Sequence, residues 1–290
     1  MRYFISFLLS SVLLCTSPIA LAEKPAQSEY PWWWSSDWWE KGQLEVPVNH
    51  AIKTESIIVT HGDSEIPVIV ARPDDNKKYP AVVFQHGRRG LDDLIALHVK
   101  RLAARGFVVV AGDVFKGRLV DNYPIEHDYA LEGDVNSVLD YALTRKDISS
   151  DKACIYSHTR GGYYSLKVAV TFKRQEKDLA CYVSYDPHMQ DPNLPEPAQV
   201  YRYAVEANEM KLPTLIFIGE KEQYQRRRPI EASIKAMQEN KVDAQLIIYP
   251  GVGRGFDFRP DNVRNFADDL ASKDAIQRAT KFMNKHLLGK

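Results

Sequence analysis

Residues 154–162 read CIYSHTRGG. An apolar run typical of a buried strand leads into a tight turn, and the glycines at 161 and 162 allow a helix to begin close behind it. When a strand meets a helix at a sharp turn, the central residue of the turn is presented at the rim of a sheet. The stretch therefore predicts a strand, a turn and a helix, with the hydroxyl of Thr159 at the centre of the turn.

Strand and helix signals alternate on both sides of this turn, from about residue 52 onward. We expect a hairpin over 56–73, strands at 81–85, 107–113, 152–157, 180–185, 213–218 and 244–249, and helices at 91–106, 130–146, 161–174, 197–209, 229–240 and over 262–287. The later strands are continuous apolar runs, which indicates burial on both faces. The prediction is an α/β fold with a mostly parallel central sheet and helices on both faces. The short segment between strands 180–185 and 213–218 leaves no room for a large lid domain.

The first 51 residues differ from the rest. Residues 1–22 have a basic start, a short apolar run and a small-residue cleavage site, so they predict a signal peptide and an exported, periplasmic or secreted protein. Residues 23–51 form an arm that contains all five tryptophans, Trp32 to Trp39. The arm could pack on the domain, form a sugar-binding or partner-binding platform, or cover a pocket, and the sequence leaves these alternatives open. Residues 52–290 form the main domain.

Charge and cysteine content narrow the function classes. The chain has 38 basic and 38 acidic residues, which gives no support to a nucleic-acid partner. No segment after the signal peptide is long and apolar enough to span a membrane. Cys154 and Cys181 lie near the starts of two strands and could form a disulfide or remain two buried thiols. We expect no metal site and no cofactor, and the oligomeric state is left open.

Three loops that follow strands carry the candidate chemistry, because ligands bind beyond the carboxyl ends of parallel strands. They are SHTRGG at 157–162, FIGEKEQY at 217–224 and YPGVGRGF at 249–256. Together with PAVVFQHGRRG (80–90), LAARGFVVVAGDVFKG (102–117) and AIQRATKFMNKHL (275–287), they resemble the dienelactone hydrolase family of the α/β-hydrolases over most of the chain. The resemblance implies that fold, an ester or lactone substrate, and a catalytic triad.

The resemblance places the triad on Thr159, Glu222 and Arg254, and all three depart from the family pattern of Ser or Cys, Asp and His. Glutamate keeps a carboxylate, and threonine keeps a hydroxyl on a stiffer, β-branched side chain. Arginine is the severe change, because a guanidinium stays protonated and cannot act as a general base near neutral pH. The inherited mechanism is therefore expected to be disabled.

Other residues could bind a ligand or replace the missing base. His188 and His86 follow neighbouring strands and are candidate bases, although each could equally be a hydrogen-bonded structural histidine. By family analogy, the backbone amides of Arg160 and of Gly87 or Arg88 form an oxyanion hole, which survives because it does not depend on side chains. Arg88, Arg89, Arg160, Arg254 and the run 226–228 add positive charge, unless acids such as Asp92 neutralise them.

Two functions follow from these residues. In the first, the protein has lost ordinary ester and lactone hydrolysis and binds a small, plausibly anionic ligand at the retained oxyanion site. In the alternative, it is an active ester or lactone hydrolase that uses Thr159 with His188 or His86 as base. A structural or partner-binding role of the tryptophan arm is a third class.

Overall fold

The computed structural model describes residues 48–260 and 262–289, and all of them belong to one compact unit. The predictions for the signal peptide and the tryptophan cluster fall on residues outside this range. Within the described ranges, no helix combines the length and apolar character needed to cross a bilayer.

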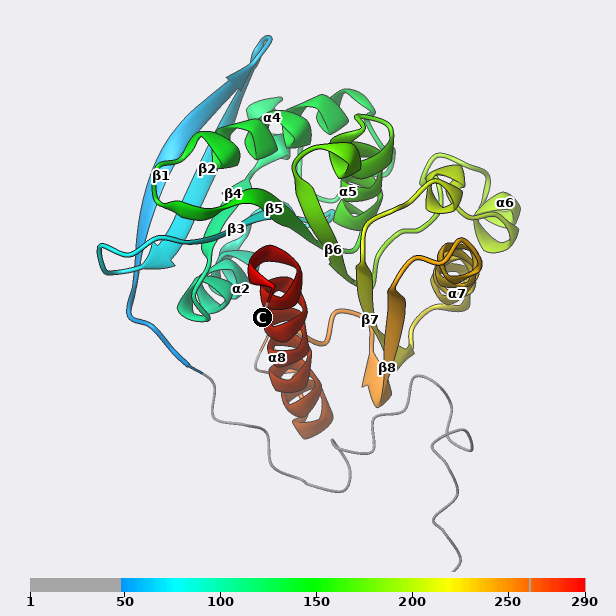
Figure 1. The fold of residues 1–290 in the computed structure, drawn as a ribbon. Coiled ribbons are helices and arrows are strands. Elements are labelled where there is room, and N and C mark those ends of the chain that lie inside the picture. The colour runs from blue at the N-terminus through cyan, green and yellow to red at the C-terminus, as the bar shows by residue number, and fades with distance from the viewer. Residues whose placement is uncertain (1–47, 261, 290) are drawn as a thin grey trace, which may run out of the picture. The chain divides into compact units, whose positions relative to one another are not determined.

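An eight-stranded sheet forms the centre of the domain (Figure 1). Its strands are β1 (Ile52–His61), β2 (Ser64–Pro73), β3 (Tyr79–Gln85), β4 (Val108–Gly112), β5 (Ile148–His158), β6 (Leu179–Tyr185), β7 (Thr214–Lys221) and β8 (Ala244–Gly253). They lie in the order β1-β2-β4-β3-β5-β6-β7-β8. β2 runs antiparallel to both β1 and β4, while β3 to β8 pair in parallel. The predicted mostly parallel sheet is confirmed.

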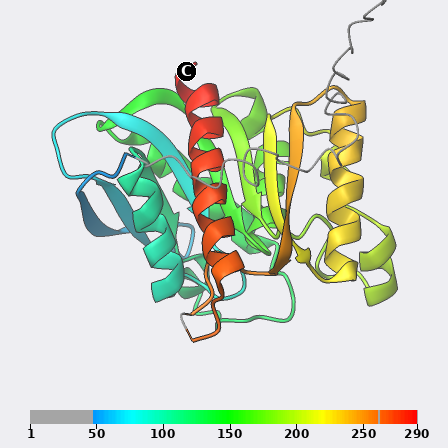
Figure 2. The ribbon, with the colours of Figure 1, turned by 90° about the horizontal axis from the view of Figure 1, so that it is seen from below.

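Helices cover both faces of this sheet (Figures 1 and 2). One face carries α2 (Asp93–Ala104) and α8 (Phe266–Leu288), and the other carries α4 (Ala130–Thr144), α5 (Gly161–Val170) and α7 (Tyr224–Glu239). An apolar core lies on each face. The short helices α3 (Val114–Gly117) and α6 (Glu196–Tyr201) lie in connections after β4 and β6. The segment between β6 and β7 holds no large lid, as expected.

Several predicted boundaries were wrong for identifiable reasons. The helix expected at 197–209 is split into α6 and a 3₁₀ turn, Val205–Asn208, because Arg202 is extended and the amide of Ala204 donates to Met189 O at 2.8 Å. α7 begins at Tyr224 rather than Pro229, so the proline lies inside the helix instead of at its start. The C-terminal segment forms one helix, α8, which begins with a capping box between Asn265 and Asp268.

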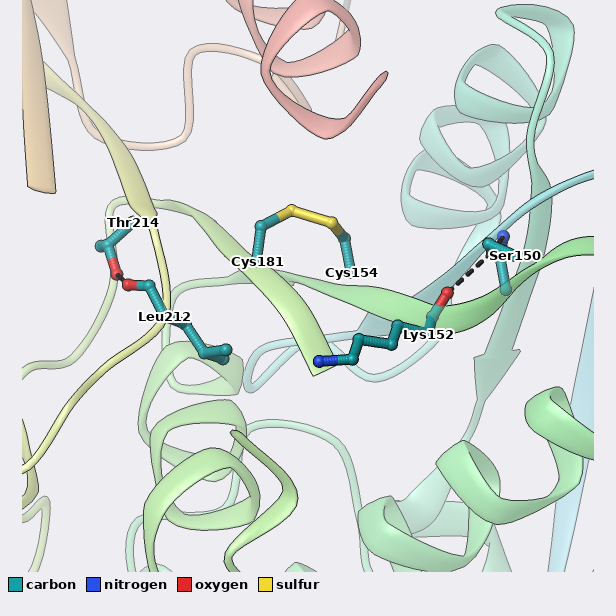
Figure 3. Close-up of a disulfide and its surroundings, with 7 residues drawn as sticks. Ser150, Lys152, Cys154, Cys181, Leu212 and Thr214 are labelled. Carbon is teal, nitrogen blue, oxygen red and sulfur yellow. Dashed lines mark hydrogen bonds between the residues drawn. A yellow bond between two sulfur atoms is a disulfide. The ribbon is translucent and has the colours of Figure 1, made fainter. Parts of the chain in front are cut away.

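A disulfide joins Cys154 of β5 to Cys181 of β6 (Figure 3). The two residues are direct register partners on neighbouring parallel strands, with a Cα–Cα distance of 4.7 Å, and both are buried. The sequence left this pairing open. The bond joins two strands near the middle of the sheet. It lies four residues before the carboxyl end of each strand, His158 in β5 and Tyr185 in β6, and the candidate site follows these ends.

Candidate functional site

The turn after β5 is a sharp elbow with Thr159 at its centre. Thr159 has a left-handed φ of 49°, which is costly for a β-branched residue. Its amide donates to Tyr185 O at 2.9 Å, and its carbonyl accepts from Gly162 N at 3.0 Å and from His188 N at 2.8 Å. The elbow is therefore tied both to the end of β6 and to the first turn of α5.

The hydroxyl of Thr159 lies against the backbone of Gly87, in the loop after β3. A Cβ added to Gly87 would lie 1.8 Å from Thr159 Oγ1. Among the described residues, no side chain forms a hydrogen bond with this hydroxyl. The elbow thus presents a hydroxyl to which no base in the described part of the chain is hydrogen-bonded.

Arg254, in the loop after β8, makes an ion pair with Glu222, in the loop after β7. The distance from Arg254 Nη1 to Glu222 Oε2 is 2.5 Å, and Glu222 Oε1 accepts from Gln223 N at 2.7 Å. The Glu222 carboxylate is fully buried, whereas the Arg254 side chain is 22% exposed. Each carboxylate oxygen accepts one hydrogen bond, so Glu222 is bonded to Arg254 and to its own neighbour in the loop.

Asp186, which follows β6, is a site residue that the sequence analysis missed. It is buried, has a φ of 45°, and its Oδ2 accepts from Gly255 N at 2.6 Å. Burial raises the pKa of Asp186 well above its ordinary value, and the charge of Glu222 raises it further, while Arg254 opposes both. The sequence does carry a signal for Asp186, since its carboxyl directly follows a buried strand in SYDPH (184–188). The sequence analysis selected only His188 from this stretch.

His188 lies buried in a strongly basic environment. Burial is the main reason that its pKa falls well below the ordinary value, and the next causes are the charges of Arg226, Arg254, Arg160 and Arg88. Its Nδ1 has no hydrogen-bond partner among the described residues. The lowered pKa favours a neutral imidazole, and the backbone N–H of His188 donates to the elbow at Thr159 O.

The four arginines differ in how they are held. Arg88 donates to the carbonyls of Tyr123 and Pro124, and Arg160 donates to the carbonyls of residues 124–126, at 2.7 to 3.0 Å. These two are fixed by neutral oxygens, which leave their charge uncompensated. Arg226, which was named only as part of the run 226–228, donates to Gln199 Oε1 at 2.9 Å. Burial and the charges of Arg254 and Arg160 lower the pKa of Arg226 to about 10.

Three other arginines named in the sequence analysis have local partners. Arg89 pairs with Asp92. On α7, Arg227 pairs with Glu231 at 2.8 Å, whereas Arg228 donates to the neutral hydroxyl of Tyr224. An acid therefore compensates the charge of Arg89 and of Arg227, but not that of Arg228.

The backbone amides expected to bind an oxyanion have no competing acceptors. Within the described ranges, the N–H groups of Gly87, Arg88 and Arg160 donate to no protein oxygen, whereas the neighbouring amide of Thr159 is used by Tyr185. Arg160 directly precedes α5, whose N-terminus adds partial positive charge.

His86 makes contacts that lead away from Thr159. Its Nδ1 lies 2.8 Å from Gly87 O, its Nε2 lies 3.8 Å from Asp113 Oδ1, and its ring packs edge-on against Phe115. These contacts position the loop that carries Gly87, which is a supporting role.

Known proteins resemble this chain in both sequence and structure. The sequence profile of the dienelactone hydrolase family matches residues 66–287. The chain belongs to the dienelactone hydrolase family. A putative carboxymethylenebutenolidase of Aquifex aeolicus is 26% identical over 184 residues, which is 61% of this chain and 76% of that protein.

Solved structures show the same fold. A putative dienelactone hydrolase from Klebsiella pneumoniae superposes with a TM-score of 0.66 at 18% identity, over 81% of this chain and all of that one. The dienelactone hydrolase-like promiscuous phosphotriesterase P91, from metagenomic libraries, has a TM-score of 0.63 at 16% identity and covers 82% of this chain and 99% of its own.

Within this dienelactone hydrolase fold, the structure brings Glu222 and Arg254 into contact and places Thr159 on the elbow against Gly87. His188 and Arg160 lie beside them, and His86 lies behind the Gly87 loop. The three positions that the family resemblance implies lie in the loops after β5, β7 and β8, at the carboxyl edge of the sheet.

Proposed function

We propose that this dienelactone hydrolase-like protein binds a small oxyanion at the elbow and does not carry out the ester or lactone hydrolysis typical of its family. The observation that carries the proposal is Arg254 at the position of the catalytic base, ion-paired to Glu222. Hydrolysis through Thr159 requires a group that accepts the hydroxyl proton, and a guanidinium is a donor only. Glu222, the carboxylate implied by the family resemblance, is bonded to Arg254 and Gln223.

Charge around the elbow supports an anionic ligand. The charges of four arginines lower the pKa of His188, and among the described residues only Glu222 forms an ion pair with one of these arginines. Burial favours the protonated form of Asp186. Arg226 and Arg254 carry planar donor groups suited to carboxylate, phosphate or sulfate oxygens. The free amides of Gly87, Arg88 and Arg160 add donors that require no side-chain movement. Monoanionic or dianionic phosphate, sulfate and short carboxylates are the ligand class.

Calorimetric titration with inorganic phosphate, sulfate and acetate tests the proposal. The parent protein should bind at least one of them. Arg226→Ala and Arg254→Ala should each weaken binding about tenfold or more, as expected for the loss of a charge-assisted hydrogen bond worth roughly 1.5–3 kcal/mol. Arg227→Ala is the matched control, because Arg227 lies on the same helix but pairs with Glu231. Unchanged affinity in both Arg226→Ala and Arg254→Ala would refute the assignment.

Hydrolysis of short p-nitrophenyl esters tests the loss of catalysis. The parent should be no faster than Thr159→Ala, and the Thr159→Ser/Arg254→His protein should gain turnover. One observation favours the alternative, an active hydrolase: His188 is neutral, has an unpartnered Nδ1 and is bonded through its backbone to Thr159. If the parent is active and both Thr159→Ala and His188→Gln abolish turnover, the alternative is correct.

We also propose that the protein works after export, in the periplasm or outside the cell. The signal-like residues 1–22 and the paired, buried Cys154 and Cys181 support an oxidising compartment. Cell fractionation followed by N-terminal sequencing is the test. Intact Met1 on protein confined to the cytoplasm would rule out export.

A further inference from the structure

Two histidines and an aspartate meet on the face of the sheet that α2 and α8 cover. His98 lies on α2, His158 ends β5, and Asp257 follows β8. Asp257 Oδ2 lies 2.8 Å from His158 Nε2 and 3.4 Å from His98 Nδ1. One potential ligand atom from each residue lies within 4.8 Å of the others, and all three residues are buried.

His158 Nε2 and Asp257 Oδ2 lie 2.8 Å apart and partner each other as a buried ion pair. The other ring nitrogen of His158, Nδ1, and the second carboxylate oxygen of Asp257, Oδ1, are buried without a hydrogen-bond partner among the described residues. Buried polar atoms are almost always satisfied, so these two atoms require an explanation. Imidazole and carboxylate are the ligands that zinc and related divalent ions take in proteins.

His98 is held in the orientation that a metal ligand needs. Its Nε2 lies 2.7 Å from the buried hydroxyl of Tyr156, which leaves Nδ1 facing Asp257. A hydrogen bond to the second ring nitrogen is the usual support of a ligating histidine, because it fixes both the tautomer and the ring orientation.

A cavity of about 500 Å³ borders the cluster on one side, with His98 and Asp257 in its lining. The rest of the lining comes mainly from α2, α8 and the start of β1. Five basic residues line the cavity: Lys100, Arg101, Arg105, Arg264 and Lys273. Asp269 pairs with Arg264 and Lys273, so part of this charge is compensated and the rest favours anions.

We infer that His98, His158 and Asp257 form a three-ligand site for a divalent transition metal, best matched by zinc, with a fourth position open to the cavity. Tetrahedral zinc with ligand distances of about 2.0–2.2 Å requires only small shifts of these side chains. Water or a small anion from the basic cavity takes the fourth position. The sequence predicted no metal site, because the three residues come from segments far apart in the chain.

The test uses tag-free protein stripped with a chelator, dialysed against Zn²⁺ and analysed for metal content. The parent should retain about one zinc per chain, and His98→Gln and Asp257→Asn should each retain less than about a tenth of that. His127→Gln is the matched control, since His127 is equally buried but pairs with Glu132 elsewhere. Co²⁺ should give the parent the visible absorption of a tetrahedral complex, and Zn²⁺ should raise the Tm of the parent but not of the two variants.

Two results would overturn the site. The first is a parent protein with neither stoichiometric zinc nor the Co²⁺ absorption. This result needs no variant, so it overturns the site even if a variant fails to fold. Full zinc retention by folded His98→Gln and Asp257→Asn places the metal elsewhere.

Discussion

Thr159 Oγ1 occupies the space that a side chain at Gly87 would need. The elbow and the loop that carries Gly87 are thus packed against each other. A Cβ added to Gly87 would lie 1.8 Å from Thr159 Oγ1 and 2.9 Å from His158 O, which leaves no room for a methyl group. This contact explains why glycine is required at position 87 regardless of the chemistry performed there.

Gly87→Ala should therefore destabilise the fold by about 1–3 kcal/mol, the usual cost of overpacking. Thr159→Gly should relieve part of the clash. The Gly87→Ala/Thr159→Gly protein should therefore be more stable than the sum of the two single-variant changes in unfolding free energy predicts. Urea unfolding of the four proteins measures this coupling. Gly251→Ala is the control, because its added methyl meets no atom within 4 Å and should show no coupling to Thr159→Gly.

The left-handed backbone at Thr159 predicts a second stability effect. A β-branched residue at φ 49° costs roughly 1–2 kcal/mol, of which glycine recovers part after its greater entropy loss on folding. Thr159→Gly should stabilise the protein by about 0.5–1 kcal/mol. Thr171→Gly, at the C-cap of α5 with a helical φ of −66°, should instead destabilise it. A stability loss in both variants would mean that the elbow is not strained.

The raised pKa of Asp186 predicts a pH dependence. An acid whose pKa is higher in the folded than in the unfolded state contributes stability that is full below the unfolded pKa, near 3.8, and falls as the pH rises toward the folded pKa. Asp186→Asn should flatten this decline between about pH 5 and pH 8 and stabilise the protein at pH 7. The measurement is the free energy of unfolding across that range.

Asp243→Asn provides the opposite sign in the same experiment. A hydrogen bond from Gln245 is the main cause that lowers the pKa of Asp243, so its contribution is present above the unfolded pKa and is lost as the pH falls. Asp243→Asn lacks this contribution, so its free energy of unfolding at pH 7 should be equal to or lower than that of the parent. Equal behaviour of the two variants would contradict the burial argument for Asp186.

The disulfide predicts a redox dependence of stability. Closing the chain between Cys154 and Cys181, 27 residues apart, should contribute about 3–4 kcal/mol through the entropy of the unfolded state. Urea unfolding with and without reductant measures it. Cys154→Ala/Cys181→Ala is the control, because its stability should not respond to reductant. A parent insensitive to reductant after full unfolding and refolding would contradict the prediction.

The sequence predicted the parallel sheet because burial on both faces leaves long apolar runs, such as those of β4 and β7. It predicted the elbow because two glycines follow a strand. The family resemblance placed Glu222 and Arg254 in one triad, but the sequence did not specify the 2.5 Å ion pair between them, because that contact depends on how two separate loops fold. Asp186 was missed because one acid after a strand resembles a turn residue. His98, His158 and Asp257 meet only once α2 packs beside α8.

The unassisted hydroxyl of Thr159 has a practical consequence for how this protein is found. Fluorophosphonate probes label hydrolases by reacting with a serine that a neighbouring base has activated, and no such base touches Thr159 in the described structure. We therefore expect these probes not to label the protein, even in a proteome where it is abundant. Its presence must instead be detected by mass spectrometry or with an antibody.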